Sequence, residues 1–150
     1  MIGIIGGSGF YNLMDNARKL SVETPFGSPS SQITIGHVAG EEVAFLARHG
    51  EDHKFPPHKV PYRANIWALH ELGVKQIITS TAVGSLKAHI RPGDILIPDQ
   101  FVNMTRREDT FYTGKDAHDP KLHPVTHISS ASPYCEDIRR ILVEAAEKNL

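Results

Sequence analysis

The chain has 150 residues, a formal net charge of -1 and 40% hydrophobic residues, which fits one soluble globular domain and excludes a disordered chain. Its 16 Lys and Arg residues are balanced by 17 Asp and Glu residues, so no broad positive field is available for binding nucleic acid. The single cysteine rules out an internal disulfide and indicates a reducing compartment, for which the cytoplasm is the default. No apolar run approaches the roughly 20 residues that a membrane-spanning helix needs.

Short apolar, β-rich runs in the first hundred positions predict the strands of a sheet. Ile2–Ile5 has the pattern of a buried strand that ends in the glycine turn Gly6–Gly9. Gln32–Val38 and Glu42–Ala47 lie on either side of the turn residues Ala39 and Gly40, which predicts a hairpin. The other expected strands are Lys19–Glu23, Val74–Thr79 and Ile95–Ile97.

Two segments have the spacing of helices. Tyr62–Leu72 places its apolar residues on one face, with Gly73 at the position of a C-terminal cap. A second helix is expected to begin at Pro133, with Ser132 as its N-cap. Its expected inner face consists of Ile138, Ile141, Leu142, Ala145 and Leu150. The polar stretch Asn103–Thr126 predicts a long loop, of the kind that serves function or contacts a partner.

These elements predict an α/β fold with a mixed twisted sheet flanked by helices, in one domain spanning residues 1–150. About six strands have only two helices to cover them, so one face of the sheet lacks cover. The last helix also ends where an α/β protein ordinarily returns to a strand. We therefore expect the chain to be incomplete at its C-terminus, as a truncated product or as one piece of an assembly.

Three predicted strands end in polar or glycine-rich segments, which begin at Gly6, Arg48 and Ser80. In open α/β sheets, ligands bind at the carboxyl ends of the strands. An anion placed there would meet backbone N–H groups, the hydroxyls of Ser8 and Thr81 and the guanidinium of Arg48. Phosphate fits this set of donors best. The alternative is that the glycines only serve tight turns and that Arg48 pairs with a carboxylate.

Several familiar site motifs are excluded. The glycine turn is not GxGxxG, because Asn12 occupies the third glycine position, and no GxxxxGK[ST] occurs. A nicotinamide enzyme or a P-loop NTPase is therefore disfavoured. His49, His53 and His58 suggest a metal site by their spacing, but a loop broken by prolines enforces no common face and no HExxH motif is present. We expect no metal, and the catalytic residue stays unassigned.

Six segments, taken together and in order, carry a family resemblance: IGIIGGSGFY (Ile2–Tyr11), TPFGSPS (Thr24–Ser30), ARHG followed by His53 and PPHK, YRANIWAL (Tyr62–Leu69), TAVGSL (Thr81–Leu86) and PGDILIPDQF (Pro92–Phe101). The set resembles the amino-terminal portion of the methylthioadenosine phosphorylase family, the trimeric type of purine nucleoside phosphorylase. Two positions depart from the family pattern, Pro61 and Asn103, where Asn and Asp are common.

The resemblance implies a nucleoside phosphorylase-like fold and phosphorolysis of S-methyl-5′-thioadenosine or its inosine counterpart. The products would be a free purine and 5-methylthioribose 1-phosphate. Inorganic phosphate is the co-substrate, and no cofactor is implied. The residues that would hold phosphate are Ser8, Arg48, His49, Thr81 and the Ala82 backbone.

Two further histidines match positions around the 5′-substituent of the substrate. His53 corresponds to a residue of the same subunit, and His127 to one lent by a neighbouring subunit, which implies a homo-oligomer, either a trimer or a hexamer. Family members also continue into a second half, with an aspartate that helps to protonate the departing purine. The resemblance thus implies a missing C-terminal half and little or no turnover by this chain alone.

Two other functions stay open from the residues. The chain can be a non-enzymatic truncated relative that acts as an anion-binding or assembly module. A histidine metallohydrolase is the third and weakest reading of the sequence.

Overall fold

The computed structural model describes residues 1–7, 14–112 and 126–149. The chain divides into two compact units, one of Met1–Ala82 with Arg107–Pro124 and one of Val83–Arg106 with Val125–Leu150. Each unit is described by itself, so the expected single domain over residues 1–150 stays a prediction. None of the helices in the described ranges is long and apolar enough to cross a membrane.

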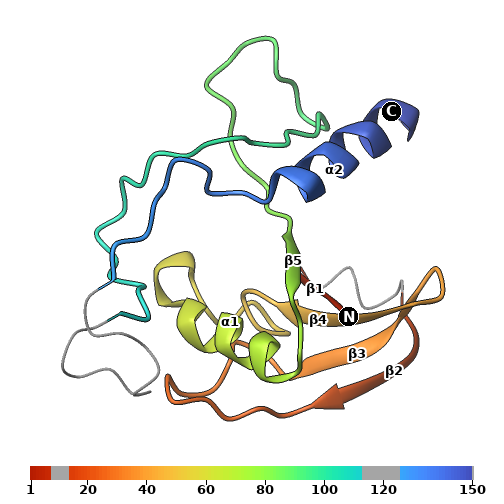
Figure 1. Cartoon of the computed structure of the whole chain (residues 1–150), viewed down its shortest axis with the longest axis vertical. Coiled ribbons are helices and arrows are strands. Elements are labelled where there is room, and N and C mark those ends of the chain that lie inside the picture. Colours follow the sequence, from red (N-terminus) through yellow and green to blue (C-terminus); the bar gives the residue numbers. More distant parts are fainter. Residues whose placement is uncertain (8–13, 113–125, 150) are drawn as a thin grey trace. The chain divides into compact units, whose positions relative to one another are not determined.

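The first unit is built on a five-stranded sheet in the order β2-β3-β4-β1-β5 (Figure 1). β1 pairs in parallel with β4 and with β5, whereas β3 pairs antiparallel with β2 and β4. The strands are β1 (Ile2–Gly6), β2 (Asp15–Leu20), β3 (Ile33–Val38), β4 (Glu41–Ala47) and β5 (Gln76–Thr79). The predicted α/β class with a mixed sheet is therefore confirmed.

The β3–β4 hairpin forms where the spacing predicts it. Its register places Val38 opposite Glu41. The two residues between them, Ala39 and Gly40, both have positive φ, 51° and 84°. Positive φ at both central positions is the mark of a type I′ turn, whose twist matches that of the flanking strands.

The second predicted strand was placed too late in the sequence. Lys19–Glu23 was expected, but β2 covers Asp15–Leu20, and the ladder with β3 ends where Leu20 faces Ile33. β2 is an edge strand whose residues are exposed apart from Leu20, which is half-buried. Such a strand shows no alternation of apolar and polar residues, because neither of its faces is buried.

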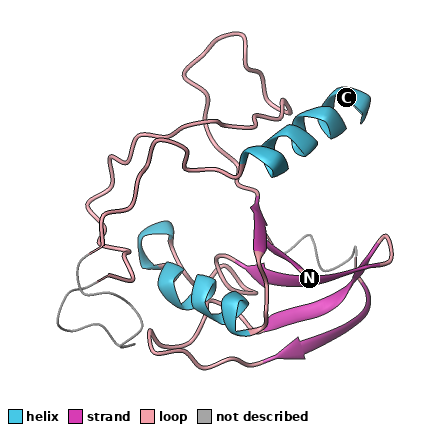
Figure 2. Cartoon of the chain, viewed as in Figure 1, coloured by secondary structure: helices cyan, strands magenta, loops and turns pink. Residues whose placement is uncertain are grey.

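The helix α1 (Tyr62–Glu71) lies along one face of the sheet, as Figure 2 shows. It ends as predicted, with Gly73 at a φ of 79°, where its N–H donates to the carbonyl of His70. The packing against β1 is close: a Cβ added to Gly3 would lie 3.4 Å from the side chain of Leu69 in α1 and 2.8 Å from that of Val74, which follows the helix. The core cluster consists of Ile5, Ile33, Ile35, Ala44, Leu46, Ala68, Leu69 and Val74.

The second unit contains no strand among its described residues. The expected strand Ile95–Ile97 is therefore wrong, although the turn before it forms, with the Asp94 N–H donating to the Arg91 carbonyl at 3.0 Å. A strand needs a neighbour to satisfy its backbone groups. Ile95 and Leu96 are instead 65% and 62% exposed.

The last helix begins later than its capping residues suggest. α2 covers Glu136–Asn149, so Ser132 and Pro133 precede it, and the first carbonyl that accepts a helical bond is that of Cys135. The segment before the helix is held in an irregular path by the Gln100 amide, which donates to the Ser130 carbonyl at 3.2 Å. The expected inner face is not covered, since no described residue of α2 is buried. Leu150 lies outside the described residues.

Candidate anion-binding site

The three strands β4, β1 and β5 end at one edge of the sheet because β1 lies between the other two and runs parallel to both. The register pairs Gly6 with Ala47. Pairing continues one residue further on each side: the Arg48 N–H donates to the Gly6 carbonyl at 3.0 Å, and the Ser80 N–H donates to the Ile5 carbonyl at 3.1 Å. Gly6, Arg48 and Ser80 therefore lie together, as the sequence predicts.

The side chain of Arg48 turns along this edge and joins β4 to the segment after β5. Its Nη1 donates to the carbonyl oxygen of Ser80 at 2.7 Å, and its Nη2 donates to the Thr81 hydroxyl at 3.1 Å. Its Nε donates to Nε2 of His49 at 3.2 Å. Among the residues that the structure describes, each of the three guanidinium nitrogens has one partner, and none of these partners is a carboxylate.

This arrangement leaves hydrogen-bond donors for a ligand. A guanidinium carries two hydrogens on each terminal nitrogen, and the bonds to Ser80 and Thr81 use one on each. The Thr81 hydroxyl accepts from Arg48 and donates to the Ala82 carbonyl at 3.4 Å, a long bond in which an anion could replace the carbonyl as acceptor. Arg48 and Thr81 can therefore both donate to one oxyanion.

His49 is fixed at both of its ring nitrogens. Nδ1 lies 2.8 Å from the carbonyl oxygen of Phe55, and Nε2 accepts from Arg48. The ring of His53 stacks parallel to it, with centroids 5.8 Å apart and planes 6° apart. His53 itself is exposed and has a φ of 52°, a left-handed conformation that few residues other than glycine adopt.

A buried polar network supports the end of β4 directly before Arg48. The Ser30 hydroxyl donates to the Ala47 carbonyl at 2.7 Å, and the Ser30 N–H donates to Oδ1 of Asn65 at 2.8 Å. Ser31 completes the attachment, because its hydroxyl accepts from the Ala47 N–H at 3.1 Å. Since Asn65 belongs to α1, this network joins the helix to the strand that carries Arg48.

The structure brings Arg48, His49, Thr81 and Ala82 of the predicted phosphate set into one neighbourhood, with His53 beside His49. Ser8 lies outside the described residues. His127 is exposed and belongs to the second unit, which is described by itself.

Among the described residues, no three His, Cys, Asp or Glu side chains gather in a way that could hold a metal ion. The pairing of His49 with His53 is a ring stack rather than a shared ligand geometry.

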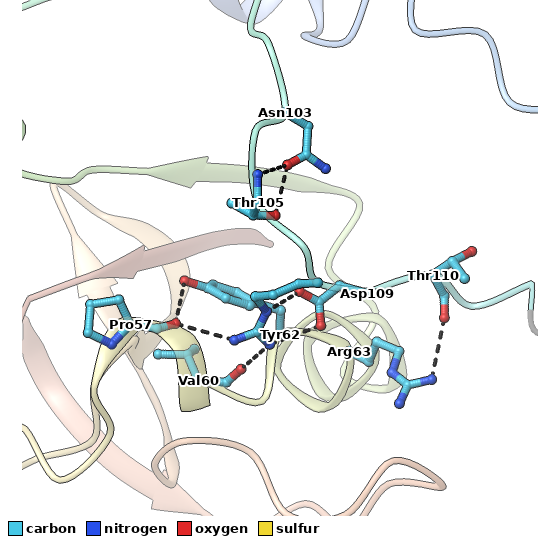
Figure 3. A network of polar contacts seen from close by, with 9 residues as sticks. Pro57, Val60, Tyr62, Arg63, Asn103, Thr105, Asp109 and Thr110 are labelled. Atoms are coloured by element: carbon cyan, nitrogen blue, oxygen red, sulfur yellow. Dashed lines mark hydrogen bonds and ion pairs between the residues drawn. The ribbon is translucent and has the colours of Figure 1, made fainter.

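A second polar cluster was not found by reasoning from the sequence. Arg107 donates to Asp109 through Nε at 2.6 Å and Nη2 at 2.9 Å, and its Nη2 also donates to the Val60 carbonyl at 2.9 Å. The guanidinium lies over the ring of Tyr62, 4.8 Å from the ring centroid. Figure 3 shows Tyr62, Val60 and Asp109 gathered at the start of α1. The cluster therefore fastens the polar segment after Arg107 to the beginning of that helix.

The ion pair between Arg107 and Asp109 shifts the pKa of both residues. The hydrogen bond from Arg107 lowers the pKa of Asp109 below its usual value, and the hydrogen bond from Asp109 raises the pKa of Arg107. Burial opposes both shifts without cancelling them. No sequence motif identifies this site, because Arg107 also donates to a backbone carbonyl, that of Pro57, which lies 50 residues away along the chain.

Comparisons with known proteins give a consistent result. A family model described as "Phosphorylase superfamily" matches residues 1–150. The S-methyl-5′-thioadenosine phosphorylase of Pyrococcus furiosus is 54% identical over 148 residues, which cover 98% of this chain and 54% of that protein. A probable 6-oxopurine nucleoside phosphorylase of Thermococcus kodakarensis is 50% identical and is covered to 55%.

The similarity extends to solved structures. The crystal structure of a methylthioadenosine phosphorylase from an antarctic soil metagenomic library superimposes with a TM-score of 0.88 and 45% identity, over 98% of this chain and 50% of that one. The chain therefore spans about half the length of the relatives it matches.

Proposed function

Because the chain belongs to the phosphorylase superfamily, we propose that it is the phosphate-holding part of an S-methyl-5′-thioadenosine phosphorylase. The reaction is phosphorolysis, in which inorganic phosphate attacks the anomeric carbon of a 5′-methylthio purine nucleoside. The bond from that carbon to the purine breaks, and the products are the free base and 5-methylthioribose 1-phosphate. Phosphate enters as a co-substrate, and the reaction needs no further cofactor.

The observation that supports this function best is the bond between Arg48 and Thr81 at the end of the parallel strands. It presents a fixed positive charge and a hydroxyl close to Gly6, the last residue of β1. As the glycosidic bond breaks, the ribose gains positive charge. A phosphate anchored next to it stabilises that charge and is already in place to form the new bond.

The residues take separate roles in this proposal. Ser8, Thr81 and the Ala82 backbone complete the cradle around Arg48, with His49 beside it. His53 and His127 face the 5′-methylthio group, His127 from a neighbouring subunit. The protein then works as a homo-oligomer, a trimer or hexamer, in the cytoplasm.

The proposal also requires a second polypeptide half, because this chain covers about half of each relative. The second unit exposes many large apolar side chains that such a half would cover. They include Val83 (73%), Leu86 (101%), Ile95 (65%), Leu96 (62%), Val102 (83%), Met104 (89%) and Ile141 (58%). We assign the purine-recognising and proton-donating residues to that half.

The experiment is a phosphorolysis assay with S-methyl-5′-thioadenosine and with its inosine counterpart. The chain is assayed alone and after refolding with a separately produced polypeptide that matches the second half of the Pyrococcus furiosus relative. We expect purine release that depends on phosphate only when both halves are present. Absence of purine release in every combination, together with absence of phosphate binding, would refute the proposal.

A second candidate function needs only the anion site, in which Arg48 donates to the Thr81 hydroxyl. A non-enzymatic module would keep the anion site or the assembly surface without turnover. Phosphate binding by the chain, with no purine release after addition of the second half, would identify it.

A further inference from the structure

A cavity of about 230 Å³ opens at the start of α1, within the first unit. That volume equals roughly eight molecules of liquid water and is smaller than the pockets of about 300–1,000 Å³ that hold drug-sized ligands. Its walls come from the loop before β3, the short 3₁₀ helix η2 (Pro57–Lys59), the first turn of α1 and the segment that begins at Arg107. The side chains that decide its chemistry are Phe26, Lys59, Tyr62, Arg63, Arg107 and Asp109.

The cavity carries an excess of positive charge. Three of its lining residues are cations and one is a carboxylate, which gives a net charge of +2 when the lining histidine, His58, is neutral. Arg107 and Asp109 offset each other, because the guanidinium binds both carboxylate oxygens, at 2.6 and 2.9 Å. The excess charge therefore comes from Lys59 and Arg63.

Lys59 and Arg63 keep most of their hydrogen-bond donors for a ligand. Among the residues that the structure describes, neither forms an ion pair with a carboxylate. Arg63 makes one long bond, in which Nη1 donates to the Thr110 carbonyl at 3.5 Å (Figure 3), although a guanidinium has five N–H donors. Its guanidinium also lies over the ring of Phe26, 5.0 Å from the centroid, which orients the side chain without using those donors.

The backbone at the start of α1 adds charge of the same sign. The helix has no side-chain N-cap, and Ala64 in its first turn lines the cavity. The N–H groups of a first turn carry partial positive charge, which favours a nearby anion. The helix end thus strengthens a site that the two cations define.

We propose that this cavity binds a small organic dianion, whose carboxylate or phosphoryl oxygens accept hydrogen bonds from Arg63 and Lys59. The arginine supplies a planar fork for two parallel bonds, and the exposed lysine supplies a point charge. The half-buried rings of Phe26 and Tyr62 line the space for the carbon chain. The inference does not depend on the proposed function, because the cavity shares no lining residue with the site around Arg48.

Chemical-shift titration of the whole chain at constant ionic strength tests the site. The probes are malonate as a dicarboxylate, glycerol 3-phosphate as a phosphate monoester and glycerol as the neutral control. The reporters are the Ala64 amide and the indole N–H of Trp67, whose ring lies 5.5 Å from that of Phe26. We expect saturable shifts with at least one dianion, at a Kd of about 1 mM or below, and none with glycerol. Absence of saturation with both dianions up to about 20 mM would overturn the proposal.

Two variants that each remove one cation locate the binding. We expect Arg63→Gln and Lys59→Gln each to weaken binding of the dianion about tenfold. Arg18→Gln is the matched control, because Arg18 is an exposed cation of β2 that does not line the cavity, and it should change the affinity less than about twofold. Equal losses in all three variants, or unchanged affinity in the first two, would overturn the proposal.

The exposed Lys59 side chain keeps the test decisive if Arg63→Gln does not fold. The result is also separable from that of the phosphorolysis assay. Failure of phosphorolysis would leave the shifts at Ala64 and Trp67 unchanged, because both residues lie outside the site around Arg48.

Discussion

The Arg48 guanidinium donates a hydrogen bond to the Thr81 hydroxyl at 3.1 Å, although the two residues are 33 positions apart in the sequence. The contact exists because β4 and β5 both flank β1, so the residues that follow the two strands emerge at the same edge. In this contact the Thr81 oxygen is the acceptor, and the same hydroxyl donates its proton to the Ala82 carbonyl in a longer bond of 3.4 Å.

Thr81→Val tests this hydroxyl, because valine keeps the shape of the side chain and removes its polar atom. We expect phosphate affinity to fall by about tenfold, through the loss of one hydrogen bond to a charged ligand and of one contact to Arg48. Thr79→Val is the matched control, since Thr79 is the last residue of β5, two positions before Thr81, and is exposed. Equal affinities of the two variants in a calorimetric titration would contradict the assignment of Thr81.

Asn65→Ala removes the buried amide that holds Ser30. Its Oδ1 accepts from the Ser30 N–H at 2.8 Å, and that N–H would be left buried without a partner. The expected loss in the free energy of unfolding is about 1–3 kcal/mol, measured by urea denaturation. Glu71→Ala, at the exposed end of the same helix, should change it by less than about 0.5 kcal/mol. A smaller loss for Asn65→Ala than for this control would show that the network adds no stability.

Gly3→Ala tests how closely β1 approaches the elements packed on it. The added Cβ would lie 2.8 Å from Val74 Cγ1 and 3.3 Å from Ile77 Cγ1, so the core has to shift. Overpacking of this kind costs about 1–3 kcal/mol, which should appear as a lower midpoint in thermal unfolding. At Gly84 nothing lies within 4 Å of an added Cβ. Gly84→Ala should therefore leave the midpoint unchanged, and a Gly3→Ala midpoint equal to it would disprove the close packing.

The Arg107–Asp109 pair should make the free energy of unfolding depend on pH in the acidic range. Because Arg107 lowers the pKa of Asp109 in the folded state, the stabilisation is present above the unfolded-state pKa and is lost as the pH falls through the folded pKa. At neutral pH, Asp109→Asn should cost no more than about 1 kcal/mol, since the pair is partly exposed. Denaturant unfolding at pH 7 and at pH 3 should show that this difference shrinks in acid. A difference that is the same at both pH values would contradict the assignment.

Much of the first unit could be predicted from the sequence because its strands are buried and its turns have distinctive residues. The type I′ turn at Ala39 and Gly40 and the cap at Gly73 are local features, fixed by residues adjacent in the chain. The meeting of Arg48 with Thr81 followed from a topological rule, that parallel strands present their carboxyl ends together.

The failures have a common physical cause, which is dependence on a distant partner. Ile95–Ile97 has a strand-like composition, but a strand requires a neighbouring strand, and no described segment of its unit provides one. β2 is exposed on both faces, so its boundaries follow from pairing with β3 and not from its own pattern. The contact of His49 with the Phe55 carbonyl depends on the path of an intervening loop, which composition does not specify.

Because β1 lies between two parallel strands, its register determines the pairing of both β4 and β5. A slip of one residue would turn Ile5 away from the core and move Gly6 by about 3.3 Å from Ala47. The backbone bonds that tie Arg48 to Gly6 and Ser80 to Ile5 would break at the same time. A chain folded with the wrong strand register would therefore lose the proposed phosphate site along with its core, so that phosphate affinity would report whether the sheet is correctly assembled.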